Sequence, residues 1–391
     1  MTLGIGIHHA LHSVREDRDI RTDHAGLIGV VPRSRWPDDA GPGDFVELRV
    51  DRAGDLDTHP VMGFFDAATK MAARAFFANG GASLTLYGLC VTGSRDLLDP
   101  AVCASRLQGL LERLCDDEEV SLLAMPALAW LPASWEGRNP AVGATEAVKR
   151  LARHCAEVGH RFLLVDAPQG ADEALVTAWV DQIRAMPDVD ASYLAVYFPW
   201  LMAGDTPLAP SGAVAGVIAR TDREFGPHGV RVPPANQEVR GFTHAAVDLT
   251  WRQGAGLVEA GVNPVLEQPG RGLVVWGART LSTEQRWRQI TARRIVSYIT
   301  ERVRRDAEWV VFEQMRPELW ETVARMVRSR LDVFWSAGLL TGEAPGNDYL
   351  VQCDAELNPP SVRDAGVVQV KMLIRPIQAT EYIEVELALG A

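Results

Sequence analysis

The sequence has few of the features that mark a secreted or membrane protein. Its five cysteines are an odd number, and no two stand at a C-x-x-C spacing. This argues against a disulfide framework or a thiolate zinc site and favours free thiols in a reducing compartment. No apolar run approaches the ~20 residues of a membrane span, and the first residues lack the pattern of a signal peptide. We therefore expect a chain that is made in, and stays in, a cytoplasm, with no direct membrane insertion.

Positive charge is also scarce. The 391 residues include 51 acidic and 39 basic side chains, which gives a formal charge of −12. Aromatic residues do not alternate with basic ones in any repeating way. A net-acidic chain without that pattern is a poor candidate for binding nucleic acid or an anionic membrane. We expect no nucleic-acid partner.

Motifs of catalysis and nucleotide binding are missing. The sequence contains no GxxxxGK[ST] phosphate loop, no GxGxxG segment after a strand, no GxSxG elbow and no HExxH pair. We therefore expect no enzyme activity, no cofactor and no metal.

Three isolated groups of residues are candidates for chemistry despite that expectation. His8 and His12 would share a helix face and could hold a metal weakly, but a solvated polar tail is the simpler interpretation. His154, Cys155 and His160 match a hydrolase only in composition, and a core cysteine with surface histidines is favoured.

Asp166 ends an apolar strand, where α/β enzymes often place a catalytic acid. The same position suits a carboxylate that caps the next helix. The capping role is favoured, and an α/β enzyme using Asp166 remains the alternative.

The length predicts more than one domain, because a single hydrophobic core usually serves no more than about 250–300 residues. From about residue 60 to 200, short apolar runs alternate with amphipathic helices, such as those expected at 100–116, 143–158 and 172–186. Strands with no polar face predict a sheet covered on both sides, and hence a three-layer α/β domain.

The last hundred residues differ in character and predict a smaller α+β domain. Helices are expected at 286–305 and 317–336, and strands at 308–313, 366–373 and 381–389. We assign residues 1–45 to an N-terminal arm outside the main core, 46–270 to the α/β domain and 271–391 to the C-terminal domain. The fold class is therefore mixed, α/β followed by α+β.

The final strand is the most informative segment. It alternates strictly, with Ile383, Val385, Leu387 and Leu389 on one face, and no hairpin partner follows it. Such an edge strand can add to a neighbour's sheet, and Ile5 and Ile7 could do the same from the N-terminal arm. If the donor and acceptor surfaces differ, the contact is head-to-tail and makes rings or open helices.

Four collinear segments resemble the signatures of a known family. PGRGLVVWGARTLS (269–282) is similar to the pattern PGRGxxVWGARTL, and WRQITARRI (287–295) is similar to WRYINVRRL. EWVVFEQMRPELW (308–320) and VQCDAELNPP (351–360) follow in the same order. They resemble the tail sheath proteins of contractile injection systems, which include contractile phage tails, R-type tailocins and phage-tail-like particles. The resemblance covers about residues 60–391 and weakens before residue 60.

The resemblance implies a structural subunit. In the family, subunits form stacked hexameric rings around an inner tube, in a helical assembly with baseplate and tail terminator or cap proteins. The N-terminal arm and the C-terminal strand join the sheet of a neighbour, and contraction of a metastable extended sheath drives the tube through a target envelope. The particle assembles in the cytoplasm and becomes part of a virion or a phage-tail-like particle released by lysis.

The resemblance also assigns a role to the helix at 317–336. A helix of the C-terminal domain faces the tube in the family, which makes Arg325, Arg328 and Arg330 the expected tube contacts. A solvated helix face is the alternative interpretation of these arginines. The divergent N-terminus keeps a second candidate open, a specialised sheath paralogue restricted to the baseplate end.

Overall fold

The larger domain is built on an eight-stranded sheet in the order β11-β10-β6-β5-β4-β1-β3-β2. The computed structural model describes residues 20–93, 95–130, 141–342, 348–379 and 381–390. The strands from β10 to β3 run parallel, whereas the edge strands β2 and β11 are antiparallel to their neighbours. The strands of this sheet are β1 (Ala25–Pro32), β2 (Phe45–Val50), β3 (Leu84–Val91), β4 (Leu122–Ala124), β5 (Phe162–Asp166), β6 (Leu194–Phe198), β10 (Val262–Gln268) and β11 (Gly272–Val275).

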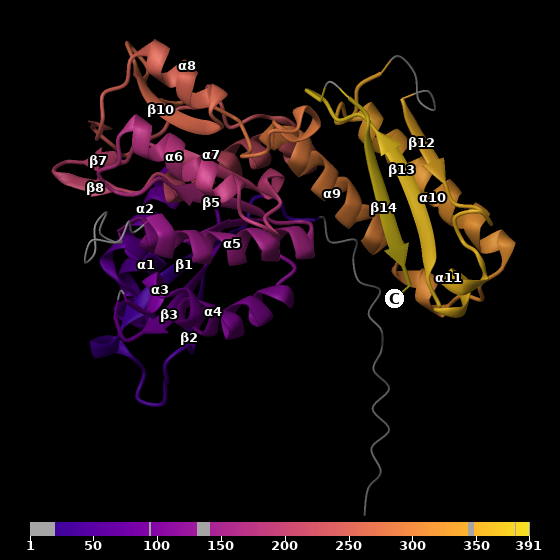
Figure 1. Ribbon diagram of the computed structural model, residues 1–391, viewed down its shortest axis with the longest axis horizontal. Coiled ribbons are helices and arrows are strands. Elements are labelled where there is room, and N and C mark those ends of the chain that lie inside the picture. Colours follow the sequence, from indigo (N-terminus) through magenta and orange to yellow (C-terminus); the bar gives the residue numbers. More distant parts are fainter. Residues whose placement is uncertain (1–19, 94, 131–140, 343–347, 380, 391) are drawn as a thin grey trace, which may run out of the picture.

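Helices cover both faces of this sheet, which confirms the three-layer prediction (Figure 1). One face packs against α4 (Pro100–Cys115), α5 (Ala141–Val158), α6 (Glu173–Arg184) and α8 (Trp251–Glu259). The other face packs against α2 (Ala67–Ala78) and α7 (Ser211–Glu224). Successive strand residues supply the two cores alternately: Leu27 belongs to one core and Ile28 to the other.

Several of these helices begin at an aspartate. Asp66, Asp99 and Asp172 are the N-cap residues of α2, α4 and α6, and each carboxylate accepts hydrogen bonds from backbone N–H groups of the first turn. An aspartate in this position satisfies donors that have no partner within the helix. This local chemistry explains why the predicted helices lie close to the observed ones.

Shorter elements complete the domain. A small antiparallel sheet has the order β8-β7-β9. The remaining short elements of both domains are α1 (Asp55–Thr58), α3 (Arg95–Leu98), β7 (Leu201–Ala203), β8 (Thr206–Leu208), β9 (His244–Ala245), η1 (Arg33–Arg35), η2 (Pro60–Gly63), η3 (Pro126–Trp130), η4 (Ala191–Tyr193), η5 (Gly226–Arg231), η6 (Gln285–Trp287) and η7 (Glu308–Phe312).

The expectation that residues 1–45 form an arm outside the core is wrong for residues 25–32. This segment is β1, which lies between β3 and β4 inside the large sheet and pairs with both in parallel. Leu27 and Ile28 are completely buried. The charged stretch before residue 25 suggested an arm, but it ends where the central strand begins.

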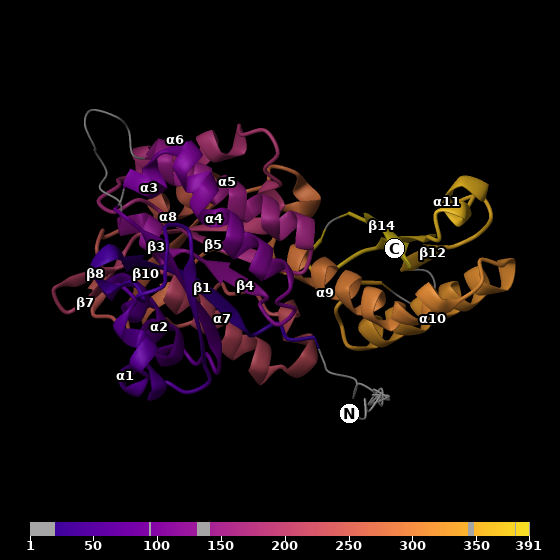
Figure 2. The same cartoon turned by 90° about the horizontal axis from the view of Figure 1, so that it is seen from below.

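The C-terminal domain is a three-stranded antiparallel sheet packed on two long helices. Its order is β12-β13-β14, with β12 (Tyr349–Gln352), β13 (Val368–Ile374) and β14 (Ile383–Leu389). The helices are α9 (Ile290–Asp306) and α10 (Pro317–Ser336), and the short α11 (Pro360–Asp364) precedes β13. A separate core lies between this sheet and the helices. Figures 1 and 2 show α9 running from the large domain into this one.

Two sequence expectations need correction in this half. Residues 308–313 were expected to form a strand, but Glu308–Phe312 forms the 3₁₀ segment η7, in which Val310 is buried and Val311 is exposed. Short apolar runs do not distinguish the two structures by periodicity. The predicted boundary at residue 270 falls in the turn between β10 and β11, so the domain change lies after Val275.

Among the residues described, no helix is both long and apolar enough to cross a membrane.

The central position of β1 leads to a stability prediction. Ile28→Ala deletes a fully buried side chain and leaves a cavity, so we expect the free energy of unfolding to fall by about 2–5 kcal/mol. Urea denaturation measures the loss. Val46→Ala, on the edge strand β2, is the control and should cost clearly less. Equal, small losses for both variants would contradict a central role for β1.

Candidate assembly surfaces

The last strand of the chain has one open edge. β14 pairs with β13 along its whole length, from Ile374↔Ile383 to Val368↔Leu389. Within the described ranges no strand pairs with its other side. A row of backbone N–H and C=O groups at such an edge is a template for another strand.

The apolar side chains of β14 pack inside their own domain. Ile383 and Leu389 are buried in the C-terminal core, and Val385 and Leu387 are half-buried against it. The opposite face carries Glu384 and Glu386. Lys371 Nζ lies 2.8 Å from Glu384 Oε1 and 3.4 Å from Glu386 Oε1. An added strand would therefore meet the backbone edge of β14 rather than these four apolar side chains. Ile5 and Ile7, the other predicted exchange residues, lie outside the described residues.

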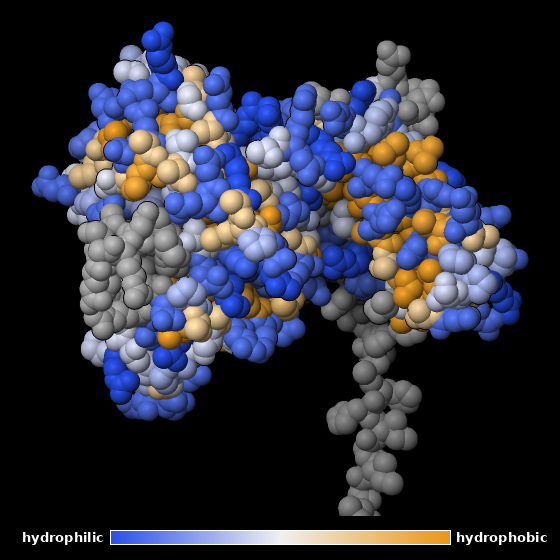
Figure 3. All heavy atoms as spheres, viewed as in Figure 1, coloured by the Kyte–Doolittle hydropathy of each residue, from blue (hydrophilic) through white to orange (hydrophobic). Residues whose placement is uncertain are grey.

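The outer face of the same sheet is partly apolar. Leu350 on β12 is 58 % exposed and stands opposite Leu373 on β13. Figure 3 shows hydrophobic residues gathered over the C-terminal domain in this view, beside hydrophilic ones. The sheet thus has an open edge and an incompletely covered face on one side of the subunit.

The three arginines predicted on α10 differ in their surroundings. Arg325 is exposed and has no hydrogen-bond or ion-pair partner within the described part of the chain. Arg328 is exposed, and its Nη2 donates to the carbonyl oxygen of Val351 at 3.3 Å. Arg330 instead pairs with Asp306 at the end of α9, with Nε 2.5 Å from Oδ2. Arg330 therefore ties two helices together, while Arg325 and Arg328 face outward.

The exposed face of α10 is mixed in charge. It also carries the carboxylates of Glu318, Glu321 and Asp332, all exposed. A partner of this face would have to match both signs of charge rather than a plain basic stripe.

The histidines near residue 155 are buried beside Arg161. Arg161 Nη1 lies 2.6 Å from His154 Nε2, and burial together with Arg161 lowers the pKa of His154 to about 4. Burial raises the pKa of the Cys155 thiol to about 12, which disfavours the thiolate form. His154 is 3 % exposed and the His160 side chain 9 %. The expectation of surface histidines is wrong, whereas Cys155 is a core cysteine as expected.

Asp166 takes part in starting a helix. Its Oδ1 accepts from the backbone N–H of Ser211 at 2.7 Å and its Oδ2 from the Ser211 hydroxyl at 2.6 Å. Burial raises its pKa to about 7, against the opposing effect of these two hydrogen bonds. The capping role was predicted for the next helix, α6, but Asp172 caps that helix and Asp166 serves α7. Asp166 is buried, and both of its carboxylate oxygens accept hydrogen bonds from Ser211 at the start of α7. This arrangement does not favour the enzyme alternative.

All five cysteine thiols are free, and all but Cys115 are buried. Within the described residues no group of three or more His, Cys, Asp and Glu side chains could hold a metal ion. His8 and His12 lie outside the described residues.

Comparison with known proteins assigns the chain to a family. Residues 116–281 match the phage tail sheath protein central domain, and residues 282–389 match the phage tail sheath C-terminal domain. Together the two matches cover more than half of the chain.

The chain belongs to the phage tail sheath family.

Two curated relatives carry the same description. The tail sheath protein of Vibrio phage KVP40 is 26 % identical over 178 residues, which is 45 % of this chain and 25 % of that protein. A putative prophage major tail sheath protein of Pseudomonas aeruginosa (strain UCBPP-PA14) is 26 % identical over 241 residues, 59 % of this chain and 58 % of the relative. The chain thus spans a quarter and somewhat over half of these two relatives.

Solved structures of this fold match nearly the whole chain. A chain from the contracted helical sheath of the anti-feeding prophage superposes with a TM-score of 0.69 at 23 % identity, covering 94 % of this chain and 93 % of that one. A chain from the anti-feeding prophage baseplate in its contracted state gives a TM-score of 0.73 at 21 % identity, with 99 % and 98 % covered. The two-domain fold is therefore the fold of sheath proteins.

The buried histidines give the subunit a testable sensitivity to acid. Burial, with Arg161, Arg304 and Arg305 nearby, lowers the pKa of His160 from 6.5 to about 3. The unfolded chain therefore binds this proton below pH 6.5, while the folded chain does not until about pH 3. Stability present above pH 6.5 is lost as the pH falls through this window.

We expect His160→Gln to reduce the slope of unfolding free energy against pH by about 1.4 kcal/mol per pH unit between pH 4 and 6. Urea denaturation of the isolated subunit at several pH values measures this slope. His244→Gln, at an exposed histidine, is the control. An unchanged slope in His160→Gln would show that His160 is not held neutral.

Proposed function

We propose that this protein is the structural subunit of a contractile sheath. The observation that carries the proposal is the match of both domains, in order, to the two sheath domain families, over residues 116–389. Subunits would assemble around an inner tube as stacked hexameric rings in an extended state. Contraction would then drive the tube through a target envelope, with baseplate and cap proteins at the two ends.

The open edge of β14 supports a specific way of linking subunits. A strand from another copy can pair with this edge without disturbing the core, because the apolar side chains of β14 already pack inward. Donor and acceptor are different segments, so the contact is heterologous and continues from copy to copy. Such a mesh would keep subunits connected while they move.

The energy for contraction would be stored at assembly. No nucleotide-binding motif occurs in the sequence. A kinetically trapped extended lattice that relaxes by rigid-body movement of its subunits needs no hydrolysis during contraction.

The exposed face of α10 is the proposed tube contact. Arg325 and Arg328 project from it, between the carboxylates of Glu321 and Asp332. Exposed, screened polar contacts of this kind are individually weak. Weak contacts suit a sheath that must leave the tube when it contracts.

A baseplate-proximal sheath paralogue is the second candidate. It is supported by the match to a chain from the anti-feeding prophage baseplate, whose TM-score of 0.73 exceeds the 0.69 of the helical sheath chain. A main sheath subunit would form long polymers, and a baseplate paralogue only short collars.

Electron microscopy of the chain expressed with its neighbouring genes tests the function. Striated tubes that sediment as large particles are expected for a main sheath. Collars confined to a baseplate would favour the paralogue. Monodisperse subunits under all conditions would contradict both candidates.

Strand addition at β14 can be tested with a pair of proline substitutions. Neighbouring residues of a strand point their N–H groups to opposite sides, so of Val385→Pro and Glu386→Pro one removes an N–H bonded to β13 and the other an N–H at the open edge. We expect the substitution that removes an N–H bonded to β13 to unfold the C-terminal domain. The substitution that removes an N–H at the open edge should leave a folded subunit that no longer assembles. Circular dichroism and sedimentation measure the two effects. Normal sheaths from the folded member of the pair would contradict strand addition.

The proposed tube contact of α10 can be tested by reversing the charge of two of its arginines. Arg325→Glu with Arg328→Glu should reduce co-sedimentation of the sheath with tube protein at least tenfold, while the unfolding free energy changes by no more than about 1 kcal/mol. Arg330→Gln is the matched control. It should destabilise the subunit, because it leaves the Asp306 carboxylate with one fewer partner. Unaltered tube binding in the double variant would exclude these residues from the tube contact.

A further inference from the structure

Helix α9 is the main physical connection between the two domains. Its first residue, Ile290, packs in a core of the α/β domain, and Ile295, Ile299 and Val303 pack in the C-terminal core. Near its start, Arg293 Nη1 donates to the Tyr193 hydroxyl of the α/β domain at 3.0 Å. A single helical connection fixes the distance between two bodies but leaves rotation about the helix axis to be restrained by other contacts.

A second connection crosses the same junction at residues 20–24, here called the strap. At one end, Ile20 is 6 % exposed and lies in the C-terminal core with Val230 and Tyr298. At the other end, His24 is fully buried in the α/β domain, with its ring nitrogens 2.8 Å from Ser83 Oγ and 2.9 Å from Thr85 Oγ1. Five consecutive residues thus run from one core into the other.

The middle of the strap is held by a buried ion pair that spans the junction. Arg294 on α9 donates from Nη1 to Asp222 Oδ1 on α7 at 3.2 Å and from Nη2 to Oδ2. The same Nη2 donates to the backbone carbonyl oxygen of Thr22 at 3.0 Å. The Arg294 and Asp222 side chains are 6 % and 1 % exposed. One guanidinium therefore joins α9, α7 and the strap, away from water, where such a bond is strong.

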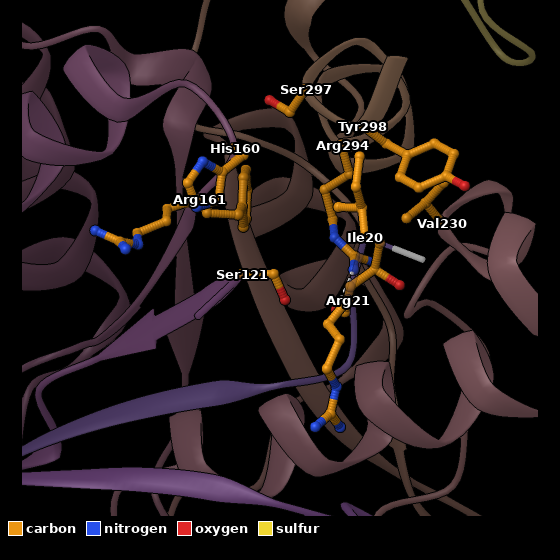
Figure 4. A pocket seen from close by; sticks show the side chains of 11 residues that line it. Ile20, Arg21, Ser121, His160, Arg161, Val230, Arg294, Ser297 and Tyr298 are labelled. Carbon is orange, nitrogen blue, oxygen red and sulfur yellow. Dashed lines mark hydrogen bonds between the residues drawn. The ribbon is translucent and has the colours of Figure 1, made fainter. Parts of the chain in front are cut away.

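The strap lines one wall of a small cavity of about 20 Å³ between the two domains. Figure 4 shows side chains that line this cavity, with Ile20, Val230 and Tyr298 on one side and His160 on the other. Among the described residues, both ring nitrogens of His160 and Ser297 Oγ are buried without a hydrogen-bond partner. His160 Nδ1 is 3.8 Å from Glu301 Oε2, beyond hydrogen-bond distance. Other bonds cross the junction beside those of the strap. Arg304 Nη2 donates to the carbonyl oxygen of Val158 at 3.3 Å, Arg305 Nη2 to that of Glu118 at 3.5 Å, and Arg231 of η5 to that of Ala337.

We propose that the strap locks the C-terminal domain against rotation about α9 and makes the subunit one rigid body. The strap does not share the axis of α9, so its two buried ends oppose rotation about that helix, together with the bonds of Arg231, Arg304 and Arg305. The strap also leads directly into residues 1–19. This consequence rests on the proposed function: a force that a neighbouring copy applies to residues 1–19 acts on both domains together and does not separate them.

The lock can be tested on the isolated subunit. Ile20→Ser removes the apolar anchor at one end of the strap, and Ile20→Val keeps it. Scanning calorimetry should show one transition for the unchanged protein and for Ile20→Val, and two for Ile20→Ser. Ile374→Ser is the matched control, because it makes the same chemical change deep in the same core, away from the strap. It should lower the transition temperature without separating the domains.

Hydrogen exchange gives an independent measure that does not depend on the melting profile. In Ile20→Ser the amides at the start of α9 should exchange at least tenfold faster, while those of β1 stay protected. Arg294→Lys serves as a second variant should Ile20→Ser fail to fold, since lysine keeps the charge near Asp222 but cannot bond Asp222 and Thr22 together. A single transition with unchanged exchange in these variants would overturn the lock.

The lock and the proposed function can be tested separately. Sheath formation by the unchanged protein, judged by microscopy, tests the function alone. If sheaths form and the lock holds, Ile20→Ser sheaths should break into short pieces on contraction at least tenfold more often than Ile20→Val sheaths. Intact contracted Ile20→Ser sheaths would show that the strap carries no load.

Discussion

A strand at the edge of a sheet has one row of backbone groups that its own sheet cannot satisfy. β14 is such a strand, because among the residues that the structure describes it pairs only with β13. The rest of the subunit is arranged so that this edge can stay open. Ile383 and Leu389 of β14 pack into the core of the domain, and Lys371, Glu384 and Glu386 place charges on the outer face beside the open edge. A subunit built this way is stable as a folded chain and still able to accept another strand.

The two domains differ in how completely they bury their sheets. The α/β domain hides a mostly parallel sheet under two helical layers and needs no partner to bury it. The C-terminal domain covers one face of its sheet with α9 and α10 and leaves an edge and part of the other face exposed. The polar groups that ordinarily suggest chemistry, such as Asp166 and His154, hold the large domain together instead. In the proposed sheath, function would lie in the exposed surfaces of the subunit and in the joint between its domains.

Long periodic segments were predictable from the sequence, and so was the layered fold. The helix at 317–336 was placed at its observed bounds because its apolar stripe is regular and a proline starts it. The central strand β1 was placed in an arm because the charged residues before it looked like a tail; its long-range pairing with β3 and β4 leaves no local signal. Likewise Val310 and Val311 lie in an apolar run too short to separate a strand from a 3₁₀ turn.

Residue roles were harder to predict than elements. Arg325 and Arg330 are only five positions apart on α10. Within the described part of the chain Arg325 has no hydrogen-bond or ion-pair partner, whereas Arg330 pairs with Asp306 of a different helix. Nothing in the spacing distinguishes them. The Arg294–Asp222 pair was missed for the same reason, since its partners are 72 residues apart and meet only through tertiary packing. The family, by contrast, was recognisable, because several long collinear motifs agree at once.

The central claim is that this chain builds a contractile sheath through the open edge of its C-terminal sheet. A helical reconstruction by electron cryomicroscopy of the assembled particle, in its extended and contracted states, tests it most directly. The account predicts a strand from a second copy hydrogen-bonded along β14 in both states, with the two domains of each subunit keeping the same relative orientation. A lattice in which the β14 edge faces solvent or the inner tube, with no strand beside it, would contradict the account.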